Sequence, residues 1–136
     1  MVFHFHLDWF IIESKHSGLV VDVAASEHGA KIITYSEHGG DNQLWRWEGF
    51  CIVSKLGLAL DVEASGSEPG TNVVSWTHHG GDNQKWRIQG DKIISEANGM
   101  ALDIEGGSHD EETPLITWPL HSETEVDNQS WRIKYV

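Results

Sequence analysis

The segment Gly-Gly-Asp-Asn-Gln-Lys-Trp-Arg-Ile at residues 80–88 decides the fold, because the chain writes it once in each third of its length. Residues 39–47 read Gly-Gly-Asp-Asn-Gln-Leu-Trp-Arg-Trp, and residues 126–133 read Val-Asp-Asn-Gln-Ser-Trp-Arg-Ile. A Gln-x-Trp tripeptide therefore recurs about every forty residues, a period typical of architectures made from repeated supersecondary units. We divide the chain into three repeats, at approximately residues 1–48, 49–90 and 91–136.

Each repeat also contains a second phrase upstream of its Gln-x-Trp tripeptide, at residues 18–23, 57–62 and 99–104. This phrase is a glycine, alternating apolar residues and an aspartate. An extended run ending in an aromatic residue follows it, and a histidine stands three positions after that residue. Four polar or aromatic residues thus recur in the same order: Asp22, Tyr35, His38 and Asn42; Asp61, Trp76, His79 and Asn83; Asp103, Trp118, His121 and Asn128.

Length and charge restrict the class of protein. A chain of 136 residues has room for one domain, so the three repeats must share one core. Nine Lys plus Arg against 21 Asp plus Glu give a formal charge of −12, which repels nucleic acid and anionic lipid. We expect neither nucleic acid nor a membrane as a partner, and no run is long and apolar enough for a membrane span.

The N-terminus and the cysteine content bear on localisation. Residues 1–8 have no basic region and end on Asp8, unlike a signal peptide. Cys51 is the only cysteine, so no intrachain disulfide forms. We expect a cytoplasmic protein or one secreted by a non-classical route.

The apolar pattern indicates an all-β protein with twelve strands, because short runs rich in Val, Ile and Trp alternate with polar residues and turn residues. We expect strands at residues 9–13, 19–23, 31–35, 43–47, 50–54, 58–62, 72–76, 84–89, 92–95, 100–104, 114–118 and 129–134. Alternation places Leu58, Leu60 and Val62 on one face and Asp61 on the other. Residues 3–5 are expected to pair near residues 131–135 and close the structure.

These repeats resemble the ricin-type lectin family, whose fold is the β-trefoil. The resemblance covers essentially the whole chain and rests on three Gln-x-Trp tripeptides, each preceded by Asp-Asn and followed by Arg. It implies a six-stranded barrel capped by three hairpins, with Trp45, Trp86 and Trp131 in the core.

The resemblance also implies a sugar site in each repeat, formed by the aspartate, the aromatic residue and the asparagine. The histidines stand where some family members place a polar residue that contacts an outer hydroxyl, so we expect binding to weaken below about pH 6. The chemistry is suitable, since carboxylates and amides bond hydroxyl pairs and a ring face contacts the C–H side of a sugar. Three structural alternatives stay open: the aspartates cap turns, the asparagines order loops, and Trp76 and Trp118 belong to the core.

The repeats are not identical. The first has Tyr35 in place of tryptophan and a shorter loop before it, and the third lacks the Gly-Gly pair. The position two residues before the aromatic, polar in some plant members of the family, is apolar here (Ile33, Val74 and Ile116). The second repeat is therefore the one whose site we expect most firmly.

Catalysis and metal binding are not expected. Three copies of one constellation give three similar pockets, whereas catalysis usually needs two unlike groups at one place. Cys51 lies in an expected strand without a matched histidine, which favours a structural thiol. The acidic residues Glu105, Asp110, Glu111 and Glu112 read as a solvated loop, and the histidine pairs at residues 4 and 6 and at residues 78 and 79 have no further zinc ligand fixed by spacing.

The sequence therefore predicts a non-enzymatic, multivalent lectin without cofactors that binds glycans, with galactose or N-acetylgalactosamine as the sugar the resemblance implies. Two alternatives remain: a trefoil that binds proteins, such as a protease inhibitor, and the targeting domain of a toxin or glycosidase. The oligomeric state stays open, a homodimer included.

Overall fold

The computed structural model describes residues 9–121 and 127–136, and these form short β-strands joined by turns. We call the three repeats the first, second and third lobes. Their strands are β1 (Phe10–Ser14), β2 (Val20–Val23), β3 (Ile32–Tyr35) and β4 (Trp45–Glu48); β5 (Cys51–Ser54), β6 (Leu58–Val62), β7 (Thr71–Thr77) and β8 (Trp86–Gln89); β9 (Lys92–Ser95), β10 (Ala101–Ile104), β11 (Leu115–Trp118) and β12 (Trp131–Tyr135). Within the described part of the chain, no helix is long and apolar enough to cross a membrane.

The first and last strands of each lobe form a barrel. β1 pairs with β12 and β4, β4 pairs with β5, and β8 pairs with β9. A bridge between Cys51 and Lys85 joins β5 to β8, and a hydrogen bond from the Trp131 amide to the Asp91 carbonyl joins β9 to β12. The barrel therefore closes, which leaves few unpaired strand edges.

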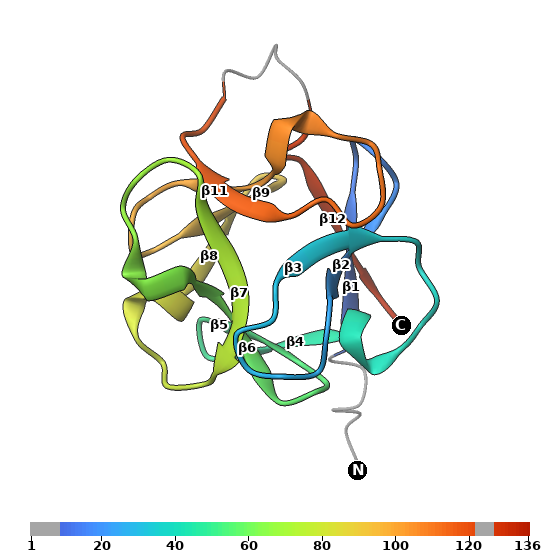
Figure 1. Ribbon diagram of the computed structural model, residues 1–136, viewed down its shortest axis with the longest axis horizontal. Helices are drawn as coiled ribbons and strands as arrows, with labels where there is room; N and C mark the ends of the chain where they lie inside the picture. Colours follow the sequence, from blue (N-terminus) through green and yellow to red (C-terminus); the bar gives the residue numbers. More distant parts are fainter. Residues whose placement is uncertain (1–8, 122–126) are drawn as a thin grey trace.

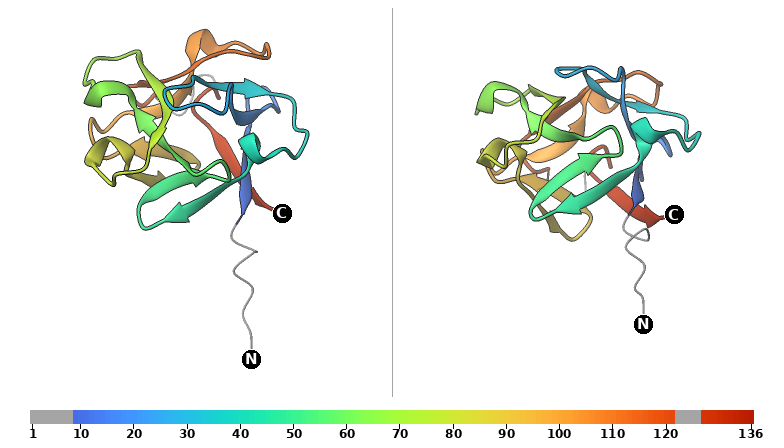
Figure 2. Two further views of the ribbon diagram at one scale, coloured as in Figure 1. Left: turned by 60° about the horizontal axis from the view of Figure 1, so that its bottom comes forward. Right: turned by 90° about the horizontal axis from the view of Figure 1, so that it is seen from below.

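The middle strands of each lobe form the hairpins β2–β3, β6–β7 and β10–β11. In Figure 1, β3, β7 and β11 lie around the centre of the molecule, and β7 pairs with β11. Figure 2 shows the hairpin layer towards one end and β4, β5 and the C-terminus towards the other. A six-stranded barrel with three hairpins is the predicted β-trefoil.

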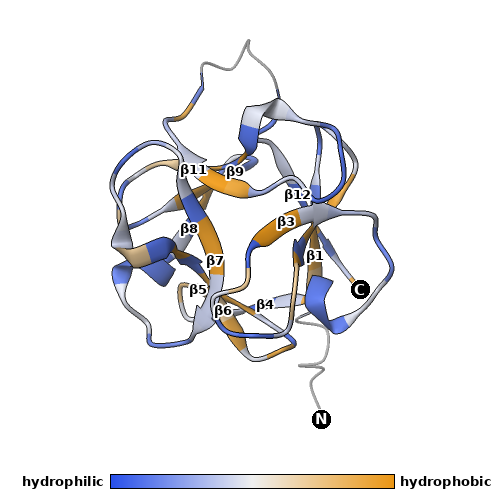
Figure 3. Ribbon diagram, viewed as in Figure 1, coloured by the Kyte–Doolittle hydropathy of each residue, from blue (hydrophilic) through white to orange (hydrophobic). Residues whose placement is uncertain are grey.

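The core lies where the barrel meets the hairpins. Figure 3 shows a hydrophobic segment in each of β3, β7 and β11, whereas most of the surrounding turns are hydrophilic. Trp45, Trp86 and Trp131 are 0%, 1% and 3% exposed. Each indole Nε1–H donates to a backbone carbonyl of the hairpin strand in its own lobe, at 3.2 Å to Val21, 3.0 Å to Leu60 and 3.0 Å to Leu102. The Gln-x-Trp tryptophans thus fasten each hairpin to the barrel.

Two sequence expectations differ from the structure. The strands expected to start at Gln43 and Gln84 start two residues later, because Asp41–Gln43 and Asp82–Gln84 are 3₁₀ turns that direct the glutamines inward. The strand expected to start at Gln129 also starts two residues later, at Trp131, because residues 127–129 form a bend and a turn. Closure is made by β1, whose residues from Phe10 to Ser14 pair with Tyr135 to Trp131. The strand expected at residues 3–5 lies outside the described residues.

Candidate functional site

The hairpin register places the aspartate and the aromatic residue of each lobe on one face. Asp61 lies opposite Val74 in the β6–β7 pair, and opposed residues share a face of the sheet. Trp76, two residues after Val74, points to the same side. The first and third lobes repeat this register, with Asp22 opposite Ile33 and Asp103 opposite Ile116. The other face of each hairpin packs into the core.

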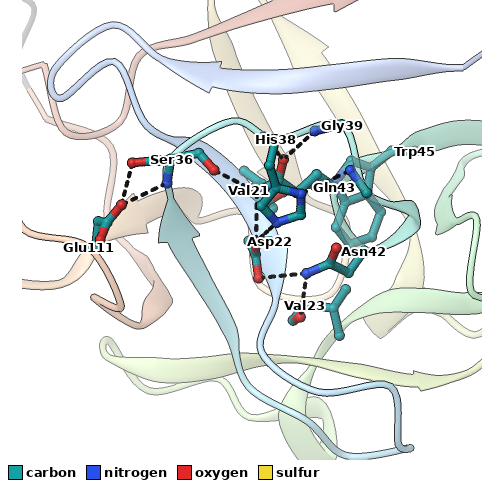
Figure 4. Close-up of polar contacts among 11 residues, drawn as sticks. Val21, Asp22, Val23, Ser36, His38, Gly39, Asn42, Gln43, Trp45 and Glu111 are labelled. Atoms are coloured by element: carbon teal, nitrogen blue, oxygen red, sulfur yellow. Dashed lines mark hydrogen bonds and ion pairs between the residues drawn. The ribbon is translucent and has the colours of Figure 1, made fainter.

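The aspartates are covered by amide side chains. Asp61 is 2% exposed, its Oδ2 accepts a hydrogen bond from Gln84 Nε2 at 2.8 Å, and its Oδ1 accepts one from Asn83 Nδ2 at 3.2 Å. Gln43 and Asn42 bond Asp22 in the same way, as Figure 4 shows. Gln129 and Asn128 do so for Asp103. The aspartates point away from the core as predicted, yet they are buried and do not cap turns.

The glutamine connects the site to its surroundings, a role that the sequence interpretation missed. Gln84 is fully buried; its Nε2 also donates to the Thr77 carbonyl at 2.9 Å, and its Oε1 accepts from the amides of His79 and Gly80 at 2.8 and 3.1 Å. It thereby holds the histidine loop against the aspartate. The available signal was its recurrence with the tryptophan in all three repeats.

The histidines present a donor to the carboxylates. The Gly81 amide donates to His79 Nδ1 at 2.9 Å, so the neutral ring carries its proton on Nε2, and Nε2 lies 3.9 Å from Asp61 Oδ2. His38 is held by Gly40 with the same geometry, and His121 Nε2 lies 3.8 Å from Asp103. These gaps are too long for a direct hydrogen bond. A ligand hydroxyl placed between the two groups can bond both.

The Gly-Gly pair has a steric explanation. The first glycine of each pair adopts a positive φ, 80° at Gly39 and 77° at Gly80, which disfavours other residues. The second lies against the site, because a Cβ at Gly81 would be 2.9 Å from Cε1 of His79 and 3.2 Å from Oδ1 of Asn83. A side chain there would displace the histidine.

In the first and third lobes, a cavity lies beside the four candidate residues that recur in each repeat. One of about 500 Å³ is lined by all four first-lobe candidates: Asp22, Tyr35, His38 and Asn42. One of about 470 Å³ is lined by all four third-lobe candidates: Asp103, Trp118, His121 and Asn128. Each cavity also contains a residue of the preceding lobe in the ring, Glu112 for the first and Gly70 for the third. The sequence interpretation missed these neighbours.

The aromatic residues are accessible. Trp76 and Trp118 are 37% and 41% exposed, in contrast to the buried Gln-x-Trp tryptophans. The alternative that these two belong to the core is therefore wrong. Ile33, Val74 and Ile116, which lie opposite the aspartates, are buried, and Ile33 and Ile116 give the first-lobe and third-lobe cavities an apolar lining.

The asparagines have fewer free hydrogen-bonding groups for a ligand than we expected from the sequence. Both Nδ2 hydrogens of Asn83 are used, one by Asp61 and one by the Val62 carbonyl at 3.1 Å, which leaves Oδ1 as an acceptor. The expected donor-and-acceptor pair is thus reduced to an acceptor. Asn128 differs again, because it is buried and its Oδ1 has no hydrogen-bond partner among the described residues.

Burial controls the electrostatics of the site. Desolvation raises the pKa of Asp22, Asp61 and Asp103 above the ordinary value of 3.8, against hydrogen bonds from the glutamines and attraction to the histidines, which lower it. A buried carboxylate with a partly satisfied shell accepts ligand hydroxyls strongly. Leaving this buried carboxylate without hydrogen-bond partners would cost folding free energy.

Residues for other chemistry do not converge. No group of three or more His, Cys, Asp or Glu side chains able to hold a metal is found among residues 9–121 and 127–136, and His4 and His6 lie outside them. Burial raises the pKa of the Cys51 thiol, which is the opposite of what a nucleophile needs.

Comparisons with known proteins agree with the geometry. The model of the ricin-type β-trefoil lectin domain family matches residues 8–131. The designed threefold-symmetric protein ThreeFoil is 34% identical with a TM-score of 0.88, over 95% of this chain and 99% of its own. The earthworm R-type lectin C-half, solved in complex with GalNAc, is 24% identical with a TM-score of 0.80, over 95% and 99%.

A third similar structure shows the domain in a larger protein. The exo-β-1,3-galactanase 1,3Gal43A from Clostridium thermocellum is 29% identical with a TM-score of 0.83, over 95% of this chain and 30% of its own. Among curated proteins, none matches this chain. With a family match over nearly its whole length and the corresponding fold, the chain belongs to the ricin-type β-trefoil lectin family, a family of carbohydrate-binding domains.

Proposed function

We propose that the protein is a multivalent, non-enzymatic lectin that binds galactose-type or N-acetylgalactosamine-type glycans, one sugar per lobe. The observation that carries the proposal is the common face in each lobe, on which a buried carboxylate lies near an imidazole and on the same side of the hairpin as an accessible aromatic ring. The carboxylate has acceptor sites left after its two amide bonds. These can accept two neighbouring hydroxyls while the ring contacts the C–H side of the sugar.

The choice of sugar rests on shape and on similar proteins. A galactose-type ring has an apolar C–H face next to a pair of hydroxyls, which suits a flat ring beside a carboxylate. The earthworm lectin was solved with GalNAc, and the C. thermocellum enzyme is a galactanase. Both facts belong to those proteins and support the proposal for this one.

A glycan array with matched variants tests the proposal. We expect the chain to bind arrays of galactose-terminated glycans, and Trp76→Ala combined with Trp118→Ala to remove most of the signal. Phe50→Ala serves as the control, because Phe50 is also an exposed aromatic residue, at 68%, but lies at the β4–β5 turn away from the hairpin faces. Silence on the array together with tight binding to a protease would instead support the protein-binding alternative.

A further inference from the structure

The aromatic residue of each lobe lies against a loop of another lobe. The Gly29 amide donates to the Ser75 carbonyl at 2.6 Å, and the Ser75 amide donates to the Ala30 carbonyl at 2.8 Å. The loop that ends the first-lobe β2–β3 connection is therefore paired with β7 beside Trp76. Gly70 bonds the Thr117 carbonyl beside Trp118, and Glu112 bonds the Thr34 carbonyl beside Tyr35, so the arrangement continues around the ring of lobes.

At Trp76 the contact involves an aromatic side chain. The imidazole of His28 lies on the indole with ring centroids 3.7 Å apart and an interplanar angle of 38°. Its Nδ1 is 2.9 Å from Oγ1 of Thr77, the residue after the tryptophan. The adjacent Gly29 has a φ of 86°, which favours glycine, and it also lies beside the indole, since a Cβ there would be in ordinary van der Waals contact with Cζ3 of Trp76 at 3.5 Å. His28 is thus fixed at two points to the strand that carries the indole.

The third lobe provides a comparison, because the cavity beside its tryptophan is defined by its lining residues. There the cavity lies between Trp118 and the turn of the same lobe, Glu105–Gly107, with Asp103 at its base. The loop from the preceding lobe reaches the cavity at Gly70, whereas Pro69, the counterpart of His28, is not among the lining residues. On this equivalence, we place His28 on the side of Trp76 that faces away from the second-lobe turn, Glu63–Ser65.

We propose that His28 is a positioning residue for the second-lobe site: it supports the Trp76 indole from the first lobe, so that the opposite ring face is presented to the sugar. This inference rests on the proposed function. The corresponding contact in the first lobe has other chemistry, because Glu111 accepts hydrogen bonds from the Ser36 amide and hydroxyl there. Pro69 occupies the position for the third lobe. Each site therefore combines the binding residues of one lobe with a contact from the neighbouring lobe, and the residue that makes this contact differs from site to site.

An NMR titration that resolves the indole resonances of Trp76 and Trp118 measures sugar binding at the second and third lobes separately. Methyl β-galactoside is the probe, and the full chain is used. Immobilising one side chain beforehand contributes about 0.5 to 1.5 kcal/mol to binding, so His28→Ala should weaken second-lobe affinity about two- to tenfold. The Trp118 titration should not change. In the free protein, the Trp76 resonance should already move when the stacked ring is removed.

Two further variants distinguish positioning from a general structural effect. His28→Phe keeps a ring on the indole and should restore most of the affinity, whereas Thr77→Val removes the hydrogen bond and should weaken the second lobe alone. Pro69→Ala is the matched control and should leave Trp76 unaffected. Wild-type second-lobe affinity in His28→Ala would overturn the proposal, as would a Trp76 signal that never responds while Trp118 does. If neither indole responds, the proposed function itself fails.

Discussion

At the scale of single residues, the buried aspartate depends on the glutamine beside it. Gln84 supplies the shorter hydrogen bond to Asp61 and also fixes the loop that bears His79. Neither contact is visible in the strand pattern, because the pattern shows only that Asp61 points away from the core. The sequence therefore predicted the side of the strand on which Asp61 lies and left the glutamine without a role.

The first prediction concerns Gln84→Ala. Removing this side chain leaves a buried carboxylate short of a hydrogen bond, so the free energy of unfolding should fall by about 2 to 3 kcal/mol. Urea unfolding measures the change. Lys85→Ala, at the middle of the same tripeptide, should stay within about 0.5 kcal/mol. Equal losses in the two variants would show that the glutamine has no special role.

The second prediction concerns pH. The aspartates have a folded pKa above 3.8, so the folded chain binds protons more tightly than the unfolded chain. Ionising them costs stability at neutral pH, and this cost is relieved as the pH falls through the folded pKa towards 3.8. Sugar affinity should change in the opposite sense, since protonation removes the acceptor.

Calorimetric titration and urea unfolding at several pH values between 7 and about 4 test this opposition, with the apo stability compared between the wild type and Asp61→Asn. The asparagine cannot titrate, so the wild type should gain stability relative to it on acidification. Sugar affinity that is constant over the whole range would contradict the role of the carboxylates.

At the scale of the element, the turn before each Gln-x-Trp tripeptide sets the shape of the site. The glycines and the repeat spacing allowed the turn to be predicted, yet its 3₁₀ form and the loss of the asparagine donors could not be. Both depend on how closely the turn approaches β6, which is a tertiary distance. The positions of Glu112 and Gly70 beside the cavities could not be predicted for the same reason, since the pairing between lobes has no local signal in the sequence.

The third prediction compares the two glycines of this turn. Gly80→Ala places a side chain at φ 77° with nothing within 4 Å, so it should cost about 1 kcal/mol of stability and leave sugar affinity unchanged. Gly81→Ala pushes a Cβ against His79 and should weaken second-lobe binding instead. Unfolding curves and the Trp76 titration measure the pair. Equal binding losses in both variants would contradict the steric account.

At the scale of the whole molecule, three hairpins of equivalent register present three similar faces around one core. Alternation and turn residues predicted the twelve strands, because they specify hairpins locally, whereas the barrel was implied by the resemblance to the lectin family. The pairing that closes the barrel, between β1 and β12, joins the two ends of the chain and has no local signal in the sequence. Several sugar sites on one molecule would bind clustered glycans with a higher overall affinity than a single site would.

The fourth prediction follows from this avidity. Trp118→Ala should reduce binding to a galactose-coated surface by about a hundredfold, while the Trp76 response to methyl β-galactoside stays the same. Surface plasmon resonance on dense and sparse coatings measures the contrast. A loss that is independent of coating density would argue against simultaneous binding by several lobes.

The most direct test of the central claim is a titration of the wild-type chain with methyl β-galactoside, followed through three indole resonances. We expect Trp76 and Trp118 to shift with saturation at concentrations of about 1 mM or more, as single shallow sites bind weakly, while the buried Trp86 stays unchanged. Trp76 and Trp118 resonances that remain fixed at every concentration would contradict the claim that a carboxylate and a ring on each hairpin face bind a sugar.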